Sequence, residues 1–321
     1  MMLFESGELE LIPVKDIKVG SGLTVDGLVR MMGESGGFTA QKLADATDVI
    51  EDMVSKEGCL RILSFPACIM STGTRGVIVD MVRNGLVDVI ITTCGTLDHD
   101  LSRTWAEYYK GDFSMDDTML REEHSISRLG NILVPDKCYG EVLEENLLPM
   151  FDEILDGRDS IAPHELLDMV GARIEDPDSL LHQCHAKGVP IIVPGITDGS
   201  FGCQLWMYYQ THRKFRLDMF ADEQLLSEMT NHAEFTGGVL IGGGISKHHV
   251  IWWNQFRGGL DYCVYMTTAQ EFDGSASGAK ISEAVSWGKV KPDARKVTVE
   301  GDATITLPVV YSALMERLDV R

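Results

Sequence analysis

Lys289 has the clearest chemical potential in this chain because of its neighbours in residues 283–290 (EAVSWGKV). Trp287 stands two residues before it, and Lys280 and Lys291 are close along the chain. Desolvation by a large aromatic ring and repulsion between like charges both lower the pKa of a lysine, and a neutral amine is the nucleophile that forms an imine. A solvated lysine beside a core tryptophan explains the same residues, so this spacing alone leaves both interpretations open.

Two adjacent histidines, His248 and His249, are the next candidates, and they follow a glycine-rich run directly. They suit a general base or a substrate donor, or simply a helix N-terminus. A metal site is disfavoured because adjacent residues point to different sides of a helix and the i,i+4 spacing of helical zinc ligands is missing. The pair His182 and His185 falls inside a predicted helix, where a solvated face is the better explanation.

Glycines and small polar residues follow four predicted strands, in residues 92–96 (TTCGT), 195–200 (GITDGS), 242–246 (GGGIS) and 267–275 (TTAQEFDGS). Ligands of open parallel sheets bind beyond the carboxyl ends of the strands, where glycine lets the backbone approach a phosphate. The triple glycine is not a dinucleotide fingerprint, because Lys247 stands where the third glycine is needed. Four such segments together still favour a nucleotide pocket. Asp198 and Asp302 are then either ribose ligands or turn-forming side chains.

The elements that must position these residues are six short, almost continuously apolar runs and four amphipathic segments. We expect strands at residues 60–64, 87–93, 189–194, 238–241, 262–266 and 296–300. Helices are expected at residues 41–55, 74–84, 176–188 and 307–318, the third beginning at Asp176-Pro177 and ending at Gly188. This alternation predicts an α/β fold, a Rossmann-like, doubly wound and mostly parallel sheet with helices on both faces, in a single large domain.

Composition and charge limit the partners of the chain. Its 321 residues carry 28 Lys and Arg against 49 Asp and Glu, a formal net charge of −21. This charge repels nucleic acid and suits polyamines or a basic protein, although acidic surfaces also serve solubility alone. The sequence has neither a signal-peptide pattern nor an apolar run long enough for a membrane span, so we expect a soluble cytoplasmic protein. Seven scattered cysteines without a C-x-x-C pair predict reduced, mostly buried thiols and no metal site.

Seven segments, in order along the chain, resemble the motifs of the deoxyhypusine synthase family. They are VDVIITT (87–93), RLGNILVP (128–135), TDGS (197–200), LIGGG with KHH (240–249), TAQEFDGS (268–275), SGA (277–279) and EAVSWGK (283–289). The resemblance begins near residue 14 and continues to the C-terminus. It predicts an N-terminal extension at residues 1–13 and one NAD-binding domain at residues 14–321.

The resemblance implies an NAD-dependent transferase. In this family spermidine gives a hydride to NAD, and a lysine carries the aminobutyl group as an imine. The group then passes to one lysine of the hypusine-containing translation initiation factor. The family members are cytoplasmic homotetramers with active sites shared between two chains.

The family's functional residues can be matched to positions of this sequence. The lysine that carries the group matches Lys289, and the histidine that accepts a proton matches His248. The matching NAD contacts are Ser71, Thr93, Gly95, Asp198, Gly243, Thr268, Ala269, Asp302 and Ala303. The expected amine contacts are His248, Gly274, Ser275, Glu283 and Trp287, together with Asp98, which replaces a family glutamate.

The sequence departs from the family in the amine pocket. His99 replaces a glutamate, and Cys203 and Ala276 each replace an aspartate. Each ammonium that leaves water needs a compensating charge, so losing three carboxylates disfavours a triamine. Two hypotheses follow: a shorter or differently ended amine, or spermidine held by carboxylates at other positions.

Two alternatives to the protein-modifying enzyme remain open. A paralogue resembling homospermidine synthase would use a different amine donor or pass the group to a free diamine. A catalytically silent NAD-binding subunit would pair with an active relative, but the intact Lys289 argues against it.

Overall fold

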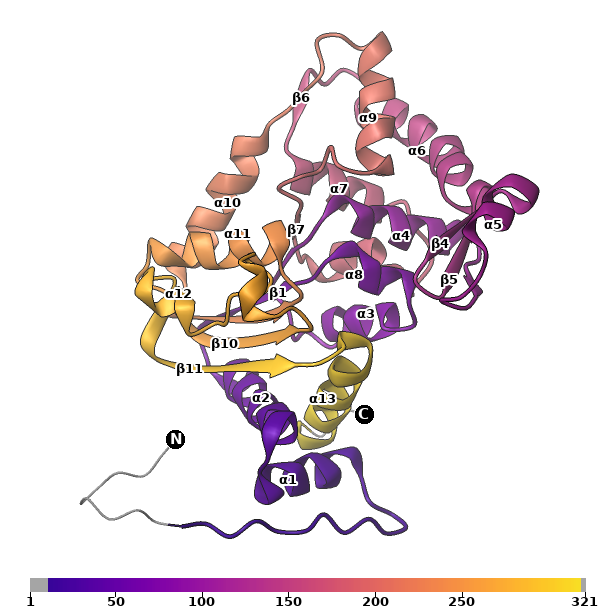
Figure 1. Ribbon diagram of the computed structural model, residues 1–321. Coiled ribbons are helices and arrows are strands. Elements are labelled where there is room, and N and C mark those ends of the chain that lie inside the picture. The colour runs from indigo at the N-terminus through magenta and orange to yellow at the C-terminus, as the bar shows by residue number, and fades with distance from the viewer. Residues whose placement is uncertain (1–10, 319–321) are drawn as a thin grey trace.

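The computed structural model describes residues 11–318, and its centre is a six-stranded sheet (Figure 1). The strands, in chain order, are β1 (Cys59–Ser64), β2 (Val89–Ile91), β7 (Ile191–Ile192), β9 (Phe235–Ile241), β10 (Leu260–Thr267) and β11 (Val290–Glu300). They lie in the order β11-β10-β9-β1-β2-β7, and every pairing is parallel. All six predicted strands are confirmed, although β11 begins at Val290 rather than Lys296.

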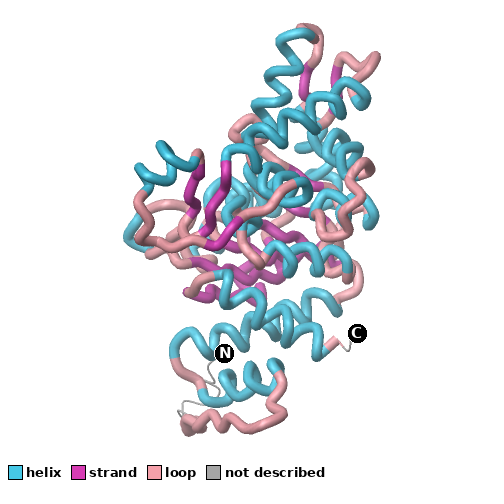
Figure 2. Tube along the Cα trace, turned by 90° about the vertical axis from the view of Figure 1, so that its right-hand side faces the viewer, coloured by secondary structure: helices cyan, strands magenta, loops and turns pink. Residues whose placement is uncertain are grey.

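Helices cover both faces of this sheet, as predicted. Neighbouring strand residues alternate between two buried clusters because successive side chains of a strand point to opposite faces. One cluster joins strand residues such as Leu63 and Val239 to helices α2 (Phe38–Ser55), α3 (Arg75–Arg83) and α13 (Ala303–Arg317). The other joins Ile62 and Leu240 to α10 (Met219–His232) and α11 (Gly244–Gln255). Figure 2 shows helices on both sides of the strands.

The predicted helices are confirmed at residues 41–55, 74–84 and 307–318, where α2, α3 and α13 lie. The prediction for residues 176–188 was wrong at its start. Helix α8 (Leu180–Lys187) begins four residues later, because the Ser179 side chain accepts a hydrogen bond from the His182 N–H and caps it. Asp176 instead accepts from the Asp178 N–H, so the Asp176-Pro177 pair makes a turn before the helix.

The remaining helices and strands lie mostly in the long connections. The helices are α1 (Val25–Ser35), α4 (Cys94–Trp105), α5 (Asp117–His124), α6 (Gly140–Ile154), α7 (Pro163–Gly171), α9 (Ser200–Thr211) and α12 (Glu283–Ser286). A small antiparallel sheet contains β3 (Tyr109–Lys110), β4 (Ile126–Leu129) and β5 (Ile132–Pro135), and β6 (Ser160–Ile161) pairs with β8 (Arg216–Leu217). The hairpin formed by β4 and β5 lies beside α4 and α5 (Figure 1).

The order of the strands fixes the place of a binding crevice. From β1 the chain moves outward to β2 and β7, and it then returns to β9 on the other side of β1 before adding β10 and β11. The winding direction therefore reverses between β1 and β9. Ligands of doubly wound sheets bind at the carboxyl ends of the two strands that flank such a reversal.

Arg317, near the end of α13, joins the first and last helices. Its side chain is 2% exposed, and its guanidinium pairs with Asp26 of α1 and with Asp48 and Glu51 of α2. Residues 11–22 form neither helix nor strand, and residues 1–10 of the predicted N-terminal extension lie outside the described residues. Between residues 11 and 318, the helices are too short or too polar to cross a membrane.

Candidate active site

A cavity of about 700 Å³ lies at the carboxyl ends of β1, β2, β9, β10 and β11, where the winding direction reverses. We call it the cradle. Most of the predicted NAD contacts line it: Ser71, Thr93, Gly243, Thr268, Ala269, Asp302 and Ala303. They come from five separate loops, so the sheet brings together residues that are more than 200 positions apart in the sequence.

Two of the predicted NAD contacts do not line the cradle. Gly95 lies in the first turn of α4, where a Cβ atom would stand 2.8 Å from the Cβ of Ala67, so this glycine allows close packing of α4. Asp198 lies in the loop between β7 and α9, and its N–H donates to the Gly195 carbonyl.

The cradle has the features that a dinucleotide requires. Gly242 and Gly244 adopt φ angles of 65° and 70°, which favour glycine, and Gly243 lies so close to Ser277 that a Cβ atom would meet it. Helix α11 begins there without a side-chain cap, so its first N–H groups can bind a phosphate. Asp302 uses Oδ1 to cap α13 through Thr304, and its other oxygen can accept from a ribose hydroxyl.

Lys247 holds the loop that closes one side of the cradle. Its Nζ donates to the carbonyls of Ala276 (2.7 Å) and Ala279 (2.6 Å) and lies 3.6 Å from the ring centre of Tyr265. The side chain is buried, and burial lowers the pKa of Lys247 to about 8. The Tyr265 hydroxyl donates to the Ser277 carbonyl of the same loop. Sequence reasoning missed this role, because Lys247 stood out only as the residue that breaks a glycine fingerprint.

Lys289 and His248 are brought together from different elements. Lys289 lies between α12 and β11, and His248 lies on α11. The Lys289 Nζ is 3.3 Å from the His248 Nε2, and it lies 5.4 Å and 5.7 Å from the ring centres of Trp287 and Trp252. Backbone hydrogen bonds from Lys289 to Ala284 and from Leu260 to Lys289 fix the position of this lysine.

The surroundings favour a neutral His248. Burial and the charge of Lys289 lower its pKa. A neutral imidazole nitrogen facing an amine can accept a proton from it. The Lys289 side chain is buried beside Trp287, which is itself 67% exposed, so the amine sits at the inner end of a partly apolar surface. Together these contacts are suited to amine chemistry.

The other expected amine contacts divide into two groups. Glu283 begins α12, one turn before Trp287, and Gly274 and Ser275 lie in the exposed loop that Lys247 holds. Ala276 lies on that same exposed loop. Asp98 and the two other altered positions, His99 and Cys203, belong to a different part of the fold.

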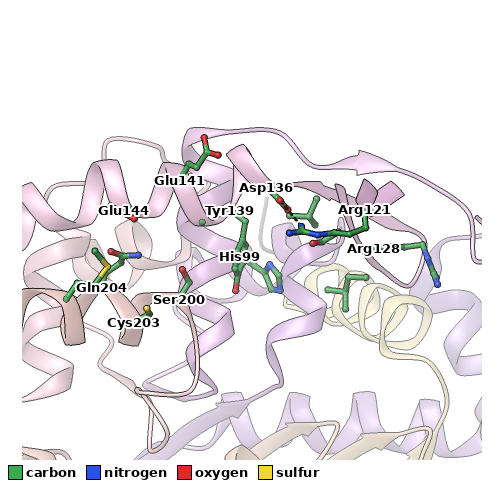
Figure 3. Close-up of a pocket in the computed structure, with 15 residues that line it drawn as sticks. His99, Arg121, Arg128, Asp136, Tyr139, Glu141, Glu144, Ser200, Cys203 and Gln204 are labelled. Atoms are coloured by element: carbon green, nitrogen blue, oxygen red, sulfur yellow. Dashed lines mark hydrogen bonds and ion pairs between the residues drawn. The ribbon is translucent and has the colours of Figure 1, made fainter. Parts of the chain in front are cut away.

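His99 and Cys203 line a second cavity of about 700 Å³, which we call the helical cavity (Figure 3). Its walls come from α4, α5, α6, α9 and the β4–β5 hairpin. The His99 Nδ1 lies 3.0 Å from the Tyr108 hydroxyl, and the ring packs against Tyr139. Burial, with a smaller contribution from Arg103, lowers the pKa of His99 to about 4, so this side chain is uncharged at neutral pH.

The structure gives Asp98 a position that differs from the expected direct contact with an amine. Its side chain is fully buried, and it accepts hydrogen bonds from the N–H groups of Ser200 and Phe201 and from the Tyr139 hydroxyl. Burial raises the pKa of Asp98 despite these bonds. This carboxylate therefore anchors the start of α9 beneath the helical cavity and does not line the cavity itself.

Comparison with known proteins gives consistent results. The family model described as deoxyhypusine synthase matches residues 27–314. A Picrophilus torridus protein described as a probable deoxyhypusine synthase is 48% identical over 312 residues, which cover 97% of this chain and all of the relative. A Thermoplasma acidophilum protein with the same description is 49% identical over 308 residues, covering 96% of this chain and 99% of the relative.

One solved structure supports the fold independently. A crystal structure described as a deoxyhypusine synthase from Entamoeba histolytica matches with a TM-score of 0.68 and 21% identity. The match covers 94% of this chain and 96% of the other. At this level of identity the likeness concerns the fold alone.

Proposed function

The chain belongs to the deoxyhypusine synthase family, and from this premise we propose that it is an NAD-dependent transferase that carries an alkylamine group on Lys289. The observation that carries the proposal is the 3.3 Å separation of the Lys289 Nζ and the His248 Nε2 between two indole rings. An amine beside a neutral imidazole can lose its proton and become a nucleophile.

The proposed reaction proceeds by exchange of imines. Loss of a hydride and a proton from the donor amine leaves a carbon–nitrogen double bond. The Lys289 amine adds to that carbon, the original amine leaves with a proton, and Lys289 holds the alkylamine chain as an imine. His248 takes the proton from the attacking amine and can return it to the leaving amine. An acceptor lysine then displaces Lys289 in the same way.

NAD, when bound, supplies the redox step by taking up the hydride and returning it to the final imine. The residues proposed to hold it are those of the cradle, with the N-terminus of α11 toward the phosphates and Asp302 toward a ribose hydroxyl. Lys247 keeps the loop of Ser275 and Ser277 against this cavity. These hydrogen bonds restrict the movement of the loop that leads to Lys289.

We propose spermidine or a related amine as the donor and one lysine of the hypusine-containing translation initiation factor as the acceptor, in the cytoplasm. Family membership supports both, and the net charge of −21 favours the approach of a cationic amine and of a basic lysine loop. We also propose a homotetramer with sites shared between two chains, as the family implies.

The experiment that tests this function is intact-protein mass spectrometry after incubation with NAD and an amine, with borohydride added to trap an imine. Spermidine, putrescine, agmatine and homospermidine are tested separately. We expect an adduct on Lys289 that is absent in Lys289→Ala and present in Lys296→Ala, which removes a different lysine, one that lies on β11. Normal transfer by Lys289→Ala would contradict the covalent mechanism. Retained NAD binding without any adduct would support a catalytically silent subunit.

One observation favours a second candidate for the substrates. The helical cavity has an uncharged histidine at position 99 and a cysteine at position 203, so these two positions offer no negative charge to a cation. A paralogue that uses a different donor or a free diamine acceptor fits this observation. Release of a free polyamine product from a diamine acceptor, without the protein acceptor, distinguishes this candidate.

A further inference from the structure

Phe113 is an exposed aromatic residue at the edge of the cradle. It lies in the connection between β3 and α5, and it is 72% exposed although it lines the cavity. Among the described residues that line the cradle, it alone has an aromatic ring. It lies outside the seven segments that resemble the motifs of the family. An apolar ring that is open to a cavity becomes more stable when a ligand covers it.

Two hydrogen bonds fix the segment that carries this ring. The Gly111 N–H donates to the Asn131 carbonyl (2.8 Å), which joins the segment to the turn of the β4–β5 hairpin. The Asp112 carboxylate accepts from the Ser114 N–H (2.8 Å), and this bond closes a turn around Phe113. The backbone on both sides of the ring is therefore held in place.

The turn of the hairpin leaves room for the ring. Gly130 has a φ angle of 63°, which favours glycine, and a Cβ atom there would lie 3.3 Å from the Cε1 of Phe113. Residues 129–132 of the hairpin line the cradle together with Phe113. The ring thus lies close to the main chain of the turn, and its position is set before a ligand binds.

The rest of the cradle makes such a ring important for affinity. Among the described residues that line it there is no lysine, arginine or histidine, so these walls offer no cationic side chain to a phosphate. The N–H groups at the start of α11 are neutral donors. Contacts with the flat, apolar parts of a dinucleotide must then supply much of the binding free energy.

We propose that Phe113 binds the cofactor directly, by stacking on one of the two flat heterocyclic rings of NAD. Aromatic side chains stack on nucleobases without requiring a particular pattern of hydrogen bonds. A ring that is already fixed loses little conformational entropy when it binds. The inference rests on the proposed function, because it takes NAD as the ligand of the cradle.

Calorimetric titration of NAD into the full-length protein tests this contact. We expect Phe113→Ala to weaken NAD binding about 30-fold. Phe113→Leu keeps an apolar side chain but removes the aromatic ring, so it should weaken binding about fivefold. Phe113→Trp should bind NAD within twofold of the wild type. Phe220→Leu is the matched control, because Phe220 is 84% exposed and does not line the cradle, and it should change the affinity less than twofold.

Two halves of the cofactor distinguish stacking from a structural role. ADP-ribose lacks the nicotinamide ring, and nicotinamide mononucleotide lacks the adenine ring. We expect Phe113→Ala to weaken only the half that carries the stacked ring, which also identifies that ring. In Phe113→Trp, NAD should quench tryptophan fluorescence more than in the wild type. Equal losses of affinity for both halves would overturn the stacking contact, since they would mean that Phe113 supports the cradle as a whole.

The outcomes separate this inference from the proposed function. Unchanged NAD affinity in Phe113→Ala would overturn the contact, even if the wild-type protein forms an adduct on Lys289. A change in oligomeric mass at unchanged NAD affinity would also overturn it and would place the ring in a contact between subunits. Weakened NAD binding in Phe113→Ala, without any adduct in the wild type, would support the contact and contradict the proposed transfer.

Discussion

The cradle and the helical cavity have similar volumes, but the chain builds them in opposite ways. The cradle is made mainly from loops at the ends of five parallel strands, and five glycines are among the residues that line it. The helical cavity is made from side chains of four helices and a hairpin, including three carboxylates and two arginines. The first site depends on the shape of the main chain, whereas the second depends on charge.

The two cavities therefore differ in how a substitution affects them. The shape of the cradle is set largely by the sheet, because its loops follow from the strands that carry them. A side-chain site can gain or lose a charge at each position while the helices stay in place.

The largest expected effect is on the pH dependence of stability, through His99 in the helical cavity. The pKa of His99 is about 4 in the folded protein and 6.5 in a freely solvated side chain. Between these values the unfolded chain binds a proton that the folded chain excludes, so stability from this group falls as the pH drops from 6.5 to 4. Between pH 7 and pH 4, we expect the free energy of unfolding to fall by about 3 kcal/mol less in His99→Gln than in the wild type. Urea unfolding at both pH values measures the difference.

Parallel pH dependence in the two proteins would contradict the buried, neutral state of His99. The two cavities would then no longer differ in pH sensitivity, because we expect the loops of the cradle to be insensitive to pH.

The next effect is on NAD affinity, when an added side chain changes the shape of the cradle. A Cβ atom at Gly243 would meet Ser277, with the Cα of that residue only 2.4 Å away, so Gly243→Ala must push the loop aside. Overpacking of this kind costs about 2 kcal/mol, which corresponds to about 30-fold in NAD affinity. Calorimetric titration of NAD measures it. Gly73→Ala is the control, because no atom lies within 4 Å of its added Cβ. Wild-type NAD affinity in Gly243→Ala would mean that this loop does not shape the site.

The smallest effect concerns Lys247, the buried lysine that holds the loop on one side of the cradle. Lys247→Met keeps the length of the side chain but leaves the carbonyls of Ala276 and Ala279 without their donor. We expect about a tenfold loss of NAD affinity, or about 1.4 kcal/mol, and faster proteolysis of the loop at residues 268–281. Lys280→Met, on the same loop but paired only with exposed Glu271, is the control. Equal proteolysis rates in the two variants would show that Lys247 does not hold the loop.

The sequence predicted the cradle better than the helical cavity for a physical reason. Apolar strands and the glycines after them are local patterns, and parallel strands must bring their carboxyl ends to one edge. His99 and Cys203 line one cavity only because helices about a hundred residues apart in the sequence pack together.

The boundaries that the sequence missed involve competing local signals. Asp176 and Ser179 are both good helix caps, and only the hydrogen bond from His182 to Ser179 shows which one acts. The first half of β11 contains Pro292, and because proline disfavours strands, the predicted strand began only at Lys296. This proline is tolerated because β11 lies at the edge of the sheet, where an unpaired backbone position has no neighbour to bind.

The position of β1 between β2 and β9 has a consequence for how the chain folds during synthesis. Cys59 of β1 pairs with Phe235 of β9, so one side of the third strand from the end of the sheet has no partner until most of the chain has left the ribosome. The ion pairs of α1 and α2 with Arg317 form later still, because Arg317 is close to the C-terminus. Contacts this distant in sequence close slowly and leave strand edges open to other chains. A nascent chain that stops before Phe235 therefore exposes an unpaired edge of β1, which β9 covers only after it has been synthesised.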